Sequence, residues 1–194
     1  IQPKEKNKPP RKFDIDIHNI ILRRCKIRYN VLSEPQKEDR FDKNHVDINN
    51  LRADIDIPRL KNNDFVFDIR RLSFKEPSGF DLTNLSGIIA INDSNISVTG
   101  LKINLPHSEI KNDKLAINFS SLSKLGKEIT SVPVDLKIKN NYITPADLKC
   151  FVPELKAFEI PIYLNADMSG NINNINVKSL IINSESDRIK VLLK

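Results

Sequence analysis

Glycine, tryptophan and cysteine are scarce in this chain. Its 194 residues include 5 glycines, 2 cysteines and no tryptophan, and aromatic residues make up 6%. So few glycines, with no G-x-G-x-x-G or Walker-type run, argue against the loops that bind nucleotide phosphates. The shortage of aromatic rings argues against stacking on sugars or single-stranded bases. No apolar run approaches the ~18 residues of a membrane-spanning helix, which excludes a helical membrane domain in this part of the chain.

The formal net charge is +6, and much of the basic excess lies in residues 1–12, where lysine and arginine are interleaved with proline. This composition is typical of an extended, solvated linker. We therefore assign residues 1–12 to a linker and residues 13–194 to a single β domain. No nucleic-acid-binding motif accompanies the basic residues, so nucleic acid is not an expected partner.

The two cysteines, Cys25 and Cys150, lie far apart in the sequence and form no C-x-x-C motif. This spacing excludes a zinc knuckle and a thioredoxin-like redox motif. A disulfide between them is compatible with the sequence, but we favour two separate buried thiols.

Apolar and polar residues alternate with a period of two from Phe13 to the end of the chain. Phe13, Ile15 and Ile17 alternate with polar residues, and further runs with this period follow. Such alternation predicts strands with one apolar face. Asparagine-rich junctions separate the runs and suit tight turns, because Asn and Asp tolerate positive φ. We predict ten to twelve antiparallel strands joined by short turns.

The alternation slips by one residue at six places of the form apolar–x–x–apolar. A slip would send every later side chain to the wrong face unless a β-bulge absorbs it. Bulges also increase twist and bend, so six of them predict a long antiparallel sheet that curls into an open groove or barrel-like shape. The other interpretation is that the strands end there in turns. The six segments are residues 17–22, 48–53, 69–74, 82–87, 98–103 and 177–182.

The apolar face of these strands needs a cover, which a second sheet, barrel closure or a bound lipid could supply. The predicted helices are too few to do so. One is expected from Thr144 to Leu155, because Thr144 and Asp147 have capping-box spacing and Pro145 suits the first position. Pro153 is expected to end or distort this helix. A further helical turn is expected over residues 120–126, and residues 33–39 are expected to form a loop.

No arrangement of reactive residues points to catalysis. The three histidines, His18, His45 and His107, lack metal-ligand spacing. Two D-x-D pairs, Asp14 with Asp16 and Asp54 with Asp56, are better explained as the hydrated face of strands than as a cation site. No nucleophile, base and orienting acid can be assembled from the spacing. We expect no enzyme activity, no metal and no cofactor.

Several phrases resemble proteins of the TamB/AsmA-like family, in particular those of Bacteroides-type bacteria. Glu76-Pro-Ser-Gly-Phe-Asp-Leu-Thr-Asn-Leu85 is similar to an E-x-S-G-aromatic-x-L-x-x-L phrase, and residues 101–110 are similar to L-x-L-x-T-P-x-S-x-I, with Leu105 in place of the usual threonine. Residues 143–155 resemble the family's D-L-x-x-F-x-P-x-L helix. The openings at residues 13–22 and 27–29 and the strand pair from Ala166 to Leu180 complete the resemblance.

The resemblance implies a fragment of a larger cell-envelope protein, anchored in the inner membrane by a segment outside these residues and extending through the periplasm. Its implied roles are outer-membrane biogenesis, phospholipid transport between membranes, and outer-membrane protein assembly or secretion. Implied partners are phospholipid acyl chains and an Omp85-type barrel, the latter through parts of the protein not present here. Nine residues are expected to line an apolar groove: Ile15, Ile17, Ile48, Ile55, Phe67, Ile69, Leu82, Ile103 and Ile162. The alternative is a self-contained β-sandwich that serves as an adhesin or ligand-binding module of the cell envelope.

Overall fold

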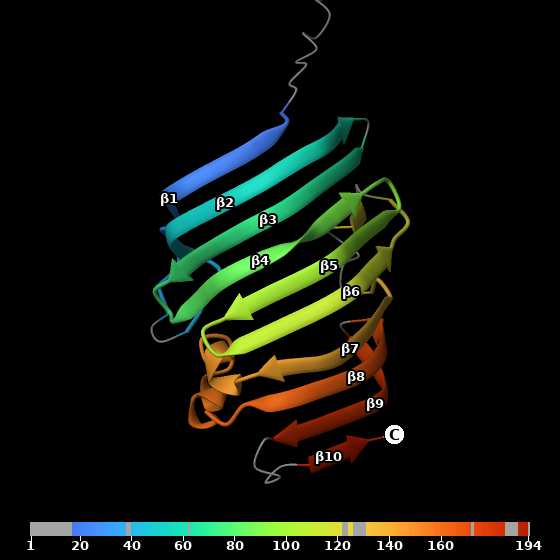
Figure 1. Ribbon diagram of the computed structural model, residues 1–194. Coiled ribbons are helices and arrows are strands. Elements are labelled where there is room, and N and C mark those ends of the chain that lie inside the picture. Colours follow the sequence, from blue (N-terminus) through green and yellow to red (C-terminus); the bar gives the residue numbers. More distant parts are fainter. Residues whose placement is uncertain are drawn as a thin grey trace, which may run out of the picture.

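The structure is a computed structural model that describes residues 17–37, 40–61, 63–121, 124–125, 131–171, 173–184 and 190–193. It consists of a single antiparallel sheet of ten strands, in which every strand pairs with its neighbours in the sequence (Figure 1). The sheet is not closed, and β1 and β10 are its edges. The expectation of a mainly β fold with one long antiparallel sheet is confirmed.

Short connections join most of the strands, which explains the simple strand order. The strands are β1 (Asn19–Asn30), β2 (His45–Lys61), β3 (Asp64–Glu76), β4 (Phe80–Ile91), β5 (Asn95–Leu105), β6 (Ser108–Asn118), β7 (Val134–Ile143), β8 (Ile162–Asn171), β9 (Asn174–Ser184) and β10 (Lys190–Leu193). The asparagine-rich junctions at residues 63–64 and 92–94 form turns, as the sequence predicts. The turns expected at the junctions 111–113 and 140–141 are wrong, because these residues lie inside β6 and β7. Asn92 Oδ1 accepts hydrogen bonds from the backbone N–H groups of Ser94 and Asn95, and Asn63 has a φ of 61°.

Five of the six predicted register slips are β-bulges in the structure. Register shifts occur at residues 48–51 of β2, 69–72 of β3, 82–85 of β4, 99–102 of β5 and 177–179 of β9. The bulges keep apolar residues on one face, and each adds local twist and bend.

The prediction for residues 17–22 is wrong. β1 begins at Asn19, and its register with β2 runs without a shift from Asn19 to Leu22. The shift in β1 lies between Leu22 and Cys25, where Arg24 has a φ of 55°. The alternation is ambiguous here because three consecutive apolar residues, Ile20 to Leu22, do not show which of them starts the new register.

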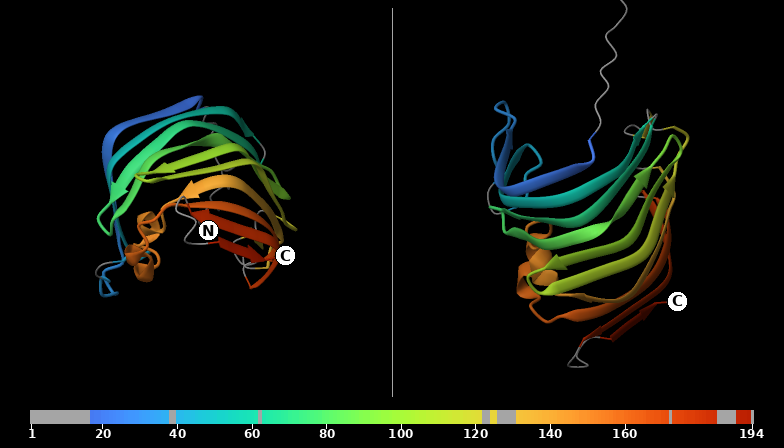
Figure 2. Two further views of the ribbon diagram at one scale, coloured as in Figure 1. Left: turned by 60° about the horizontal axis from the view of Figure 1, so that its bottom comes forward. Right: turned by 45° about the horizontal axis from the view of Figure 1, so that its top comes forward.

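The bulges and strand twist curl the sheet into an arch (Figure 2). The described residues contribute to one sheet only, so the alternative of a two-sheet sandwich is wrong. The structure therefore has a concave and a convex face, and the concave face has no second sheet opposite it.

The prediction of one helix from Thr144 to Leu155 is also wrong. The segment contains two short 3₁₀ helices instead, η1 (Pro145–Leu148) and η2 (Pro153–Ala157). Pro153 interrupts an α-helical ladder, because it has no N–H and its ring clashes with the preceding turn. The loop expected at residues 33–39 is confirmed over its described part, 33–37. In the helical turn predicted at 120–126, the backbone N–H of Leu125 donates to the carbonyl of Ser121 at 3.1 Å, as in a helix, whereas residues 122, 123 and 126 lie outside the described residues.

Candidate functional site

The apolar face of the sheet lines the concave side of the arch. Phe80 and Leu82 share one face of β4, because side chains alternate along a strand. The ring of Phe80 packs against that of Phe151, with centroids 5.1 Å apart. Phe151 lies between η1 and η2, which Figure 2 shows on the concave side. The side chains that share the face of Phe80 therefore point into the arch.

The same face continues across all the strands whose side chains are described, because paired residues share a face. Ile55 is paired with Ile20 and Ile69, and Ile103 is paired with Leu85 and Ile110. Farther along, β8 presents Ala166 and Met168 opposite residues of β7 and β9. The concave side therefore carries an apolar surface that extends across the strands, with Asn112 and Asn141 buried within it where β6 meets β7.

Most of this surface is only partly shielded from water. Leu51, Ala53, Ile57, Ile69, Leu82 and Leu105 are buried by their neighbours, whereas Ile55, Phe67, Ile103 and Ile162 keep intermediate exposure. A single layer cannot bury the ends of its own side chains unless something packs against them. A long apolar surface of this kind is typical of an interaction or ligand-binding site.

Seven of the nine predicted groove residues lie in strands of this sheet, and the alternation places them on its apolar face. These residues are Ile48, Ile55, Phe67, Ile69, Leu82, Ile103 and Ile162. Ile17 precedes β1 and is 38% exposed. Ile15 lies outside the described residues.

A shallow hollow of about 170 Å³ lies at the β7–β9 side of the concave face. It is lined by Val134, Leu136, Met168, Ser169, Gly170, Asn171 and Ile175. Gly170 has a φ of 126°, and a Cβ at this position would lie 2.1 Å from the carbonyl oxygen of Asn174. Only glycine allows this close approach of β8 and β9 beside the hollow. The sequence prediction did not include these residues, although their alternation contains the signal.

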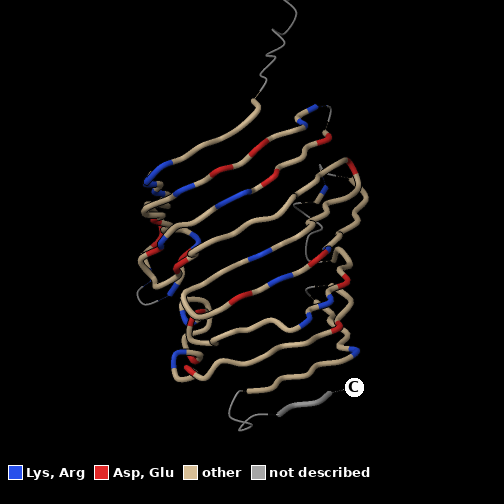
Figure 3. The backbone as a smooth tube through the Cα atoms, viewed as in Figure 1, with Lys and Arg blue, Asp and Glu red and all other residues tan. Residues whose placement is uncertain are grey.

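The convex face is polar and is covered by ion pairs between neighbouring strands. Arg70 of β3 binds Asp56 of β2, and Lys137 of β7 lies 3.8 Å from Asp167 of β8. Figure 3 shows residues of both charge signs side by side on β2 and β3. Asp54 and Asp56, the described D-x-D pair, thus belong to a hydrated strand face.

A cap formed by residues 31–37, 40–44 and 144–161 covers one rim of the concave face. Phe41 N–H donates to the carbonyl of Cys150 at 2.8 Å, and the ring of Phe151 packs against both Phe41 and Phe80. Cys150 and Cys25 are both free, so the preference for separate thiols is confirmed. Cys150 is buried as expected, whereas Cys25 keeps intermediate exposure. Burial raises the pKa of the Cys150 thiol, because the charged thiolate is poorly solvated there.

Asp42 fixes the first segment of the cap. Its carboxylate accepts the backbone N–H groups of Lys37 and Asn44, both at 3.0 Å, and lies 3.1 Å from His45 Nδ1. These bonds, led by that from Lys37, hold the pKa of Asp42 at about 2. On the strand that follows, the side chains of Arg28 and Lys26 lower the pKa of Asp47.

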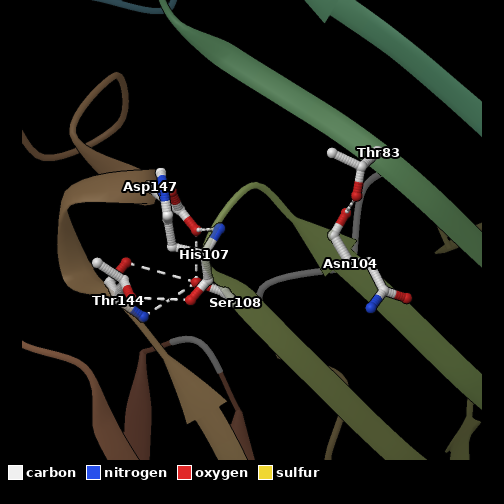
Figure 4. Close-up of polar contacts among 6 residues, drawn as sticks. All are labelled: Thr83, Asn104, His107, Ser108, Thr144 and Asp147. Atoms are coloured by element: carbon white, nitrogen blue, oxygen red, sulfur yellow. Dashed lines mark hydrogen bonds and ion pairs between the residues drawn. The ribbon is translucent and has the colours of Figure 1, made fainter.

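A second polar cluster joins the β5–β6 turn to η1 (Figure 4). Asp147 accepts hydrogen bonds from Ser108 Oγ at 2.6 Å and from the backbone N–H of His107 at 2.9 Å, and one of its oxygens lies 3.1 Å from His107 Nδ1. Thr144 donates its backbone N–H to Ser108 Oγ and its hydroxyl to the carbonyl of His107. We call these four residues the staple. Thr83 and Asn104 form a separate contact between β4 and β5 in the same view.

The order of groups in the staple differs from that of a nucleophilic triad. In a triad the imidazole lies between the hydroxyl and the carboxylate. Here the carboxylate of Asp147 lies between Ser108 and His107, and Ser108 Oγ donates to that carboxylate. This geometry supports a structural link between two connections of the sheet. Asp147, predicted to cap a helix, belongs to this link instead.

Comparison with family models, curated proteins and solved structures gave no match. Within the described ranges no helix is long and apolar enough to cross a membrane. The same part of the chain brings together no group of three or more His, Cys, Asp or Glu residues suited to a metal ion. The site is therefore defined by its own geometry, namely an apolar concave face with a polar convex face behind it.

Proposed function

We propose that this chain forms a section of an apolar groove that shields phospholipid acyl chains from water. In this proposal it belongs to a larger periplasmic scaffold that is anchored to the inner membrane and takes part in outer-membrane biogenesis. An Omp85-type barrel would be engaged through parts of the protein outside these residues. The observation that carries the proposal is the half-exposed apolar surface that extends across the strands inside the arch.

The energetics of such a groove are favourable without any specific polar contact. Removing one CH₂ group from water contributes about 0.8 kcal/mol, so a few methylene groups on this face offset the cost of ordering a chain. Because the attraction is non-directional, an acyl chain can slide along the groove. We therefore propose a role without a chemical step, and hence no enzyme activity, metal or cofactor.

Photo-crosslinking tests this proposal directly. A benzoylphenylalanine is placed at Ile103, on the concave face of β5, and in a matched variant at its neighbour Lys102, on the convex face. Both proteins are irradiated in intact cells and analysed by mass spectrometry. We expect phospholipid adducts at Ile103 and none above background at Lys102.

A second matched pair uses Ile69 and its neighbour Arg70 on β3. Ile69 is buried in the floor of the apolar face, whereas Arg70 is exposed and binds Asp56. Adducts at both members of each pair, or at neither, would contradict a lipid-binding groove. Fractionation of the same cells tests the envelope location, since the proposal requires the protein in the periplasmic or inner-membrane fraction.

A further inference from the structure

The two edges of β6 are paired very differently. On one edge, β6 pairs with β5 in a single register from Asn95–Asn118 to Leu105–Ser108. On the other edge, β6 and β7 have only two paired positions, Glu109–Tyr142 and Ile117–Val134. Both positions fit one register, so the strands meet at each end of this seam. Between them, residues 110–116 and 135–141 have no paired residue opposite.

Two asparagine side chains replace the missing backbone ladder within the seam. Asn141 Oδ1 accepts the backbone N–H of Lys111 at 2.8 Å, and Asn112 Nδ2 donates to the carbonyl of Lys137 at 2.9 Å. Asn141 is 1% exposed, and its Nδ2 has no hydrogen-bond partner. A buried donor without a partner costs about 1–3 kcal/mol. The closed seam is thus less stable than a fully paired one.

The two ends of the seam differ in how they are held. The Glu109–Tyr142 end adjoins the staple, where Ser108 and Thr144 are buried and hydrogen-bonded to each other. Ser108 also binds Asp147, and Thr144 also binds His107. The Ile117–Val134 end is an apolar pair, and Val134 also lines the hollow at the β7–β9 side of the groove. All residues that line the hollow lie on β7, β8 and β9, so a separation at this end would keep its lining intact and uncover Val134 at its edge.

We infer that the sheet opens at the β6–β7 seam, with the staple as the pivot and the Ile117–Val134 end as the moving end. Strands β1–β6 and β7–β10 then act as two bodies, and their separation controls access of an acyl chain to the hollow. The effect on access rests on the proposed function, whereas the opening itself does not. Local opening of this kind belongs where backbone pairing is least complete.

Hydrogen exchange measures the opening without any ligand. Some of the amides of residues 134–138 in β7 lack a backbone partner even in the closed seam, so the comparison includes the first disulfide lock described below. We expect these amides to exchange at least about tenfold faster than those of residues 164–168 in β8, which is paired on both sides, and to slow when the lock closes the seam. We also expect faster exchange at 134–138 than at 142–144 beside the staple. Equal protection along β7, or exchange as slow as in β8, would overturn the inference.

Two disulfide locks identify the pivot. Ile117→Cys with Val134→Cys closes the moving end, and Glu109→Cys with Tyr142→Cys closes the pivot end. Both are made with Cys25→Ser and Cys150→Ala to prevent mispairing, and the reduced form of each protein is its folding control. We expect the first lock to slow exchange at 134–138 and uptake of the fluorescent fatty acid cis-parinaric acid, each at least about fivefold. The second should change neither by more than about twofold.

The outcomes separate the two proposals. If the pivot lock slows exchange as strongly as the other lock, the assignment of pivot and moving end is wrong. If exchange responds as expected but no variant takes up parinaric acid, the lipid function fails and the opening seam stands. If uptake occurs and neither lock alters it, the seam does not control access to the groove.

Discussion

Strand β6 takes part in both the β5–β6 seam and the β6–β7 seam, and its pairing differs greatly between the two. Between β5 and β6, both strands carry an extra residue at the same place. Leu101 therefore still faces Asn112, and Val98 faces Leu115, in one uninterrupted register. Between β6 and β7 the middle of the ladder is missing. Apolar alternation thus specifies which side chains share a face, whereas the match of bulges and polar groups decides how completely two strands pair.

The largest effect is expected from placing a charge inside the incompletely paired seam. Asn141→Asp puts a carboxylate at a position that is 1% exposed and has one backbone donor, Lys111 N–H. An uncompensated buried charge costs about 3–5 kcal/mol, so the free energy of unfolding should fall by this amount at pH 7. The loss should shrink as the pH falls, because protonation removes the charge. Urea unfolding followed by circular dichroism measures both.

Asn140 provides the control for this variant. It precedes Asn141, is exposed and has a φ of 50°, which aspartate tolerates. Asn140→Asp should change the free energy of unfolding by less than about 0.5 kcal/mol. Equal effects of the two variants would show that burial at the seam is not the cause.

The next effect concerns the staple, which holds the pivot end of the seam. Asp147→Ala removes the acceptor of Ser108 Oγ and of the His107 backbone N–H. Ser108 is buried, so leaving its hydroxyl unpaired, together with the loss of the bond from the exposed His107 N–H, should cost about 2–3 kcal/mol. His107→Ala removes a side chain that is 73% exposed and should cost less than about 1 kcal/mol. A larger loss for His107→Ala would contradict the central place of the carboxylate.

A smaller effect is expected at the bulge that β5 carries in its fully paired region. Gly100 has a φ of 63°, and no atom lies within 4 Å of the position of an added Cβ. Gly100→Val should therefore destabilise through backbone strain alone, by about 1–2 kcal/mol. Gly100→Asn should cost less, because asparagine tolerates this conformation. Equal losses in urea unfolding would mean that the bulge does not require positive φ.

The smallest effect is expected on the convex face, where β5 and β6 are joined by surface charges. The pKa of Glu109 is lowered below its usual value of 4.5, chiefly by the hydrogen bond that Lys111 donates to it. Lys102 and Asn104 lower it to a smaller extent. Because the pKa is lowered in the folded state, the ionised Glu109 contributes to folding stability above pH 4.5. This contribution is lost as the pH falls through the folded-state pKa. Lys102→Ala should lower Tm by less than about 2 °C at pH 7 and by nothing measurable at about pH 2. A larger shift in differential scanning calorimetry, or one that persists in acid, would contradict this.

Particular residues show where sequence reasoning succeeded and where it failed. Asn50 and Gly100, each directly before an apolar residue, mark bulges that the alternation predicted. The bulge between Ile138 and Asn141 was missed, because the residue that resumes the apolar face is polar. The sequence signal for this bulge is Asn140, which has a φ of 50°, because asparagine tolerates positive φ. The groove residues of the central strands followed from alternation, whereas the staple joins residues nearly 40 positions apart and has no local signature.

The sequence by itself determined a one-sided antiparallel sheet with bulges, because side-chain alternation and turn residues act between near neighbours in the chain. Only the tertiary structure decided that the sheet stays a single open arch, that a cap covers one rim, and that the β6–β7 ladder is interrupted. Those features depend on which distant backbone and side-chain groups find partners, and a pattern with a period of two carries no information about that.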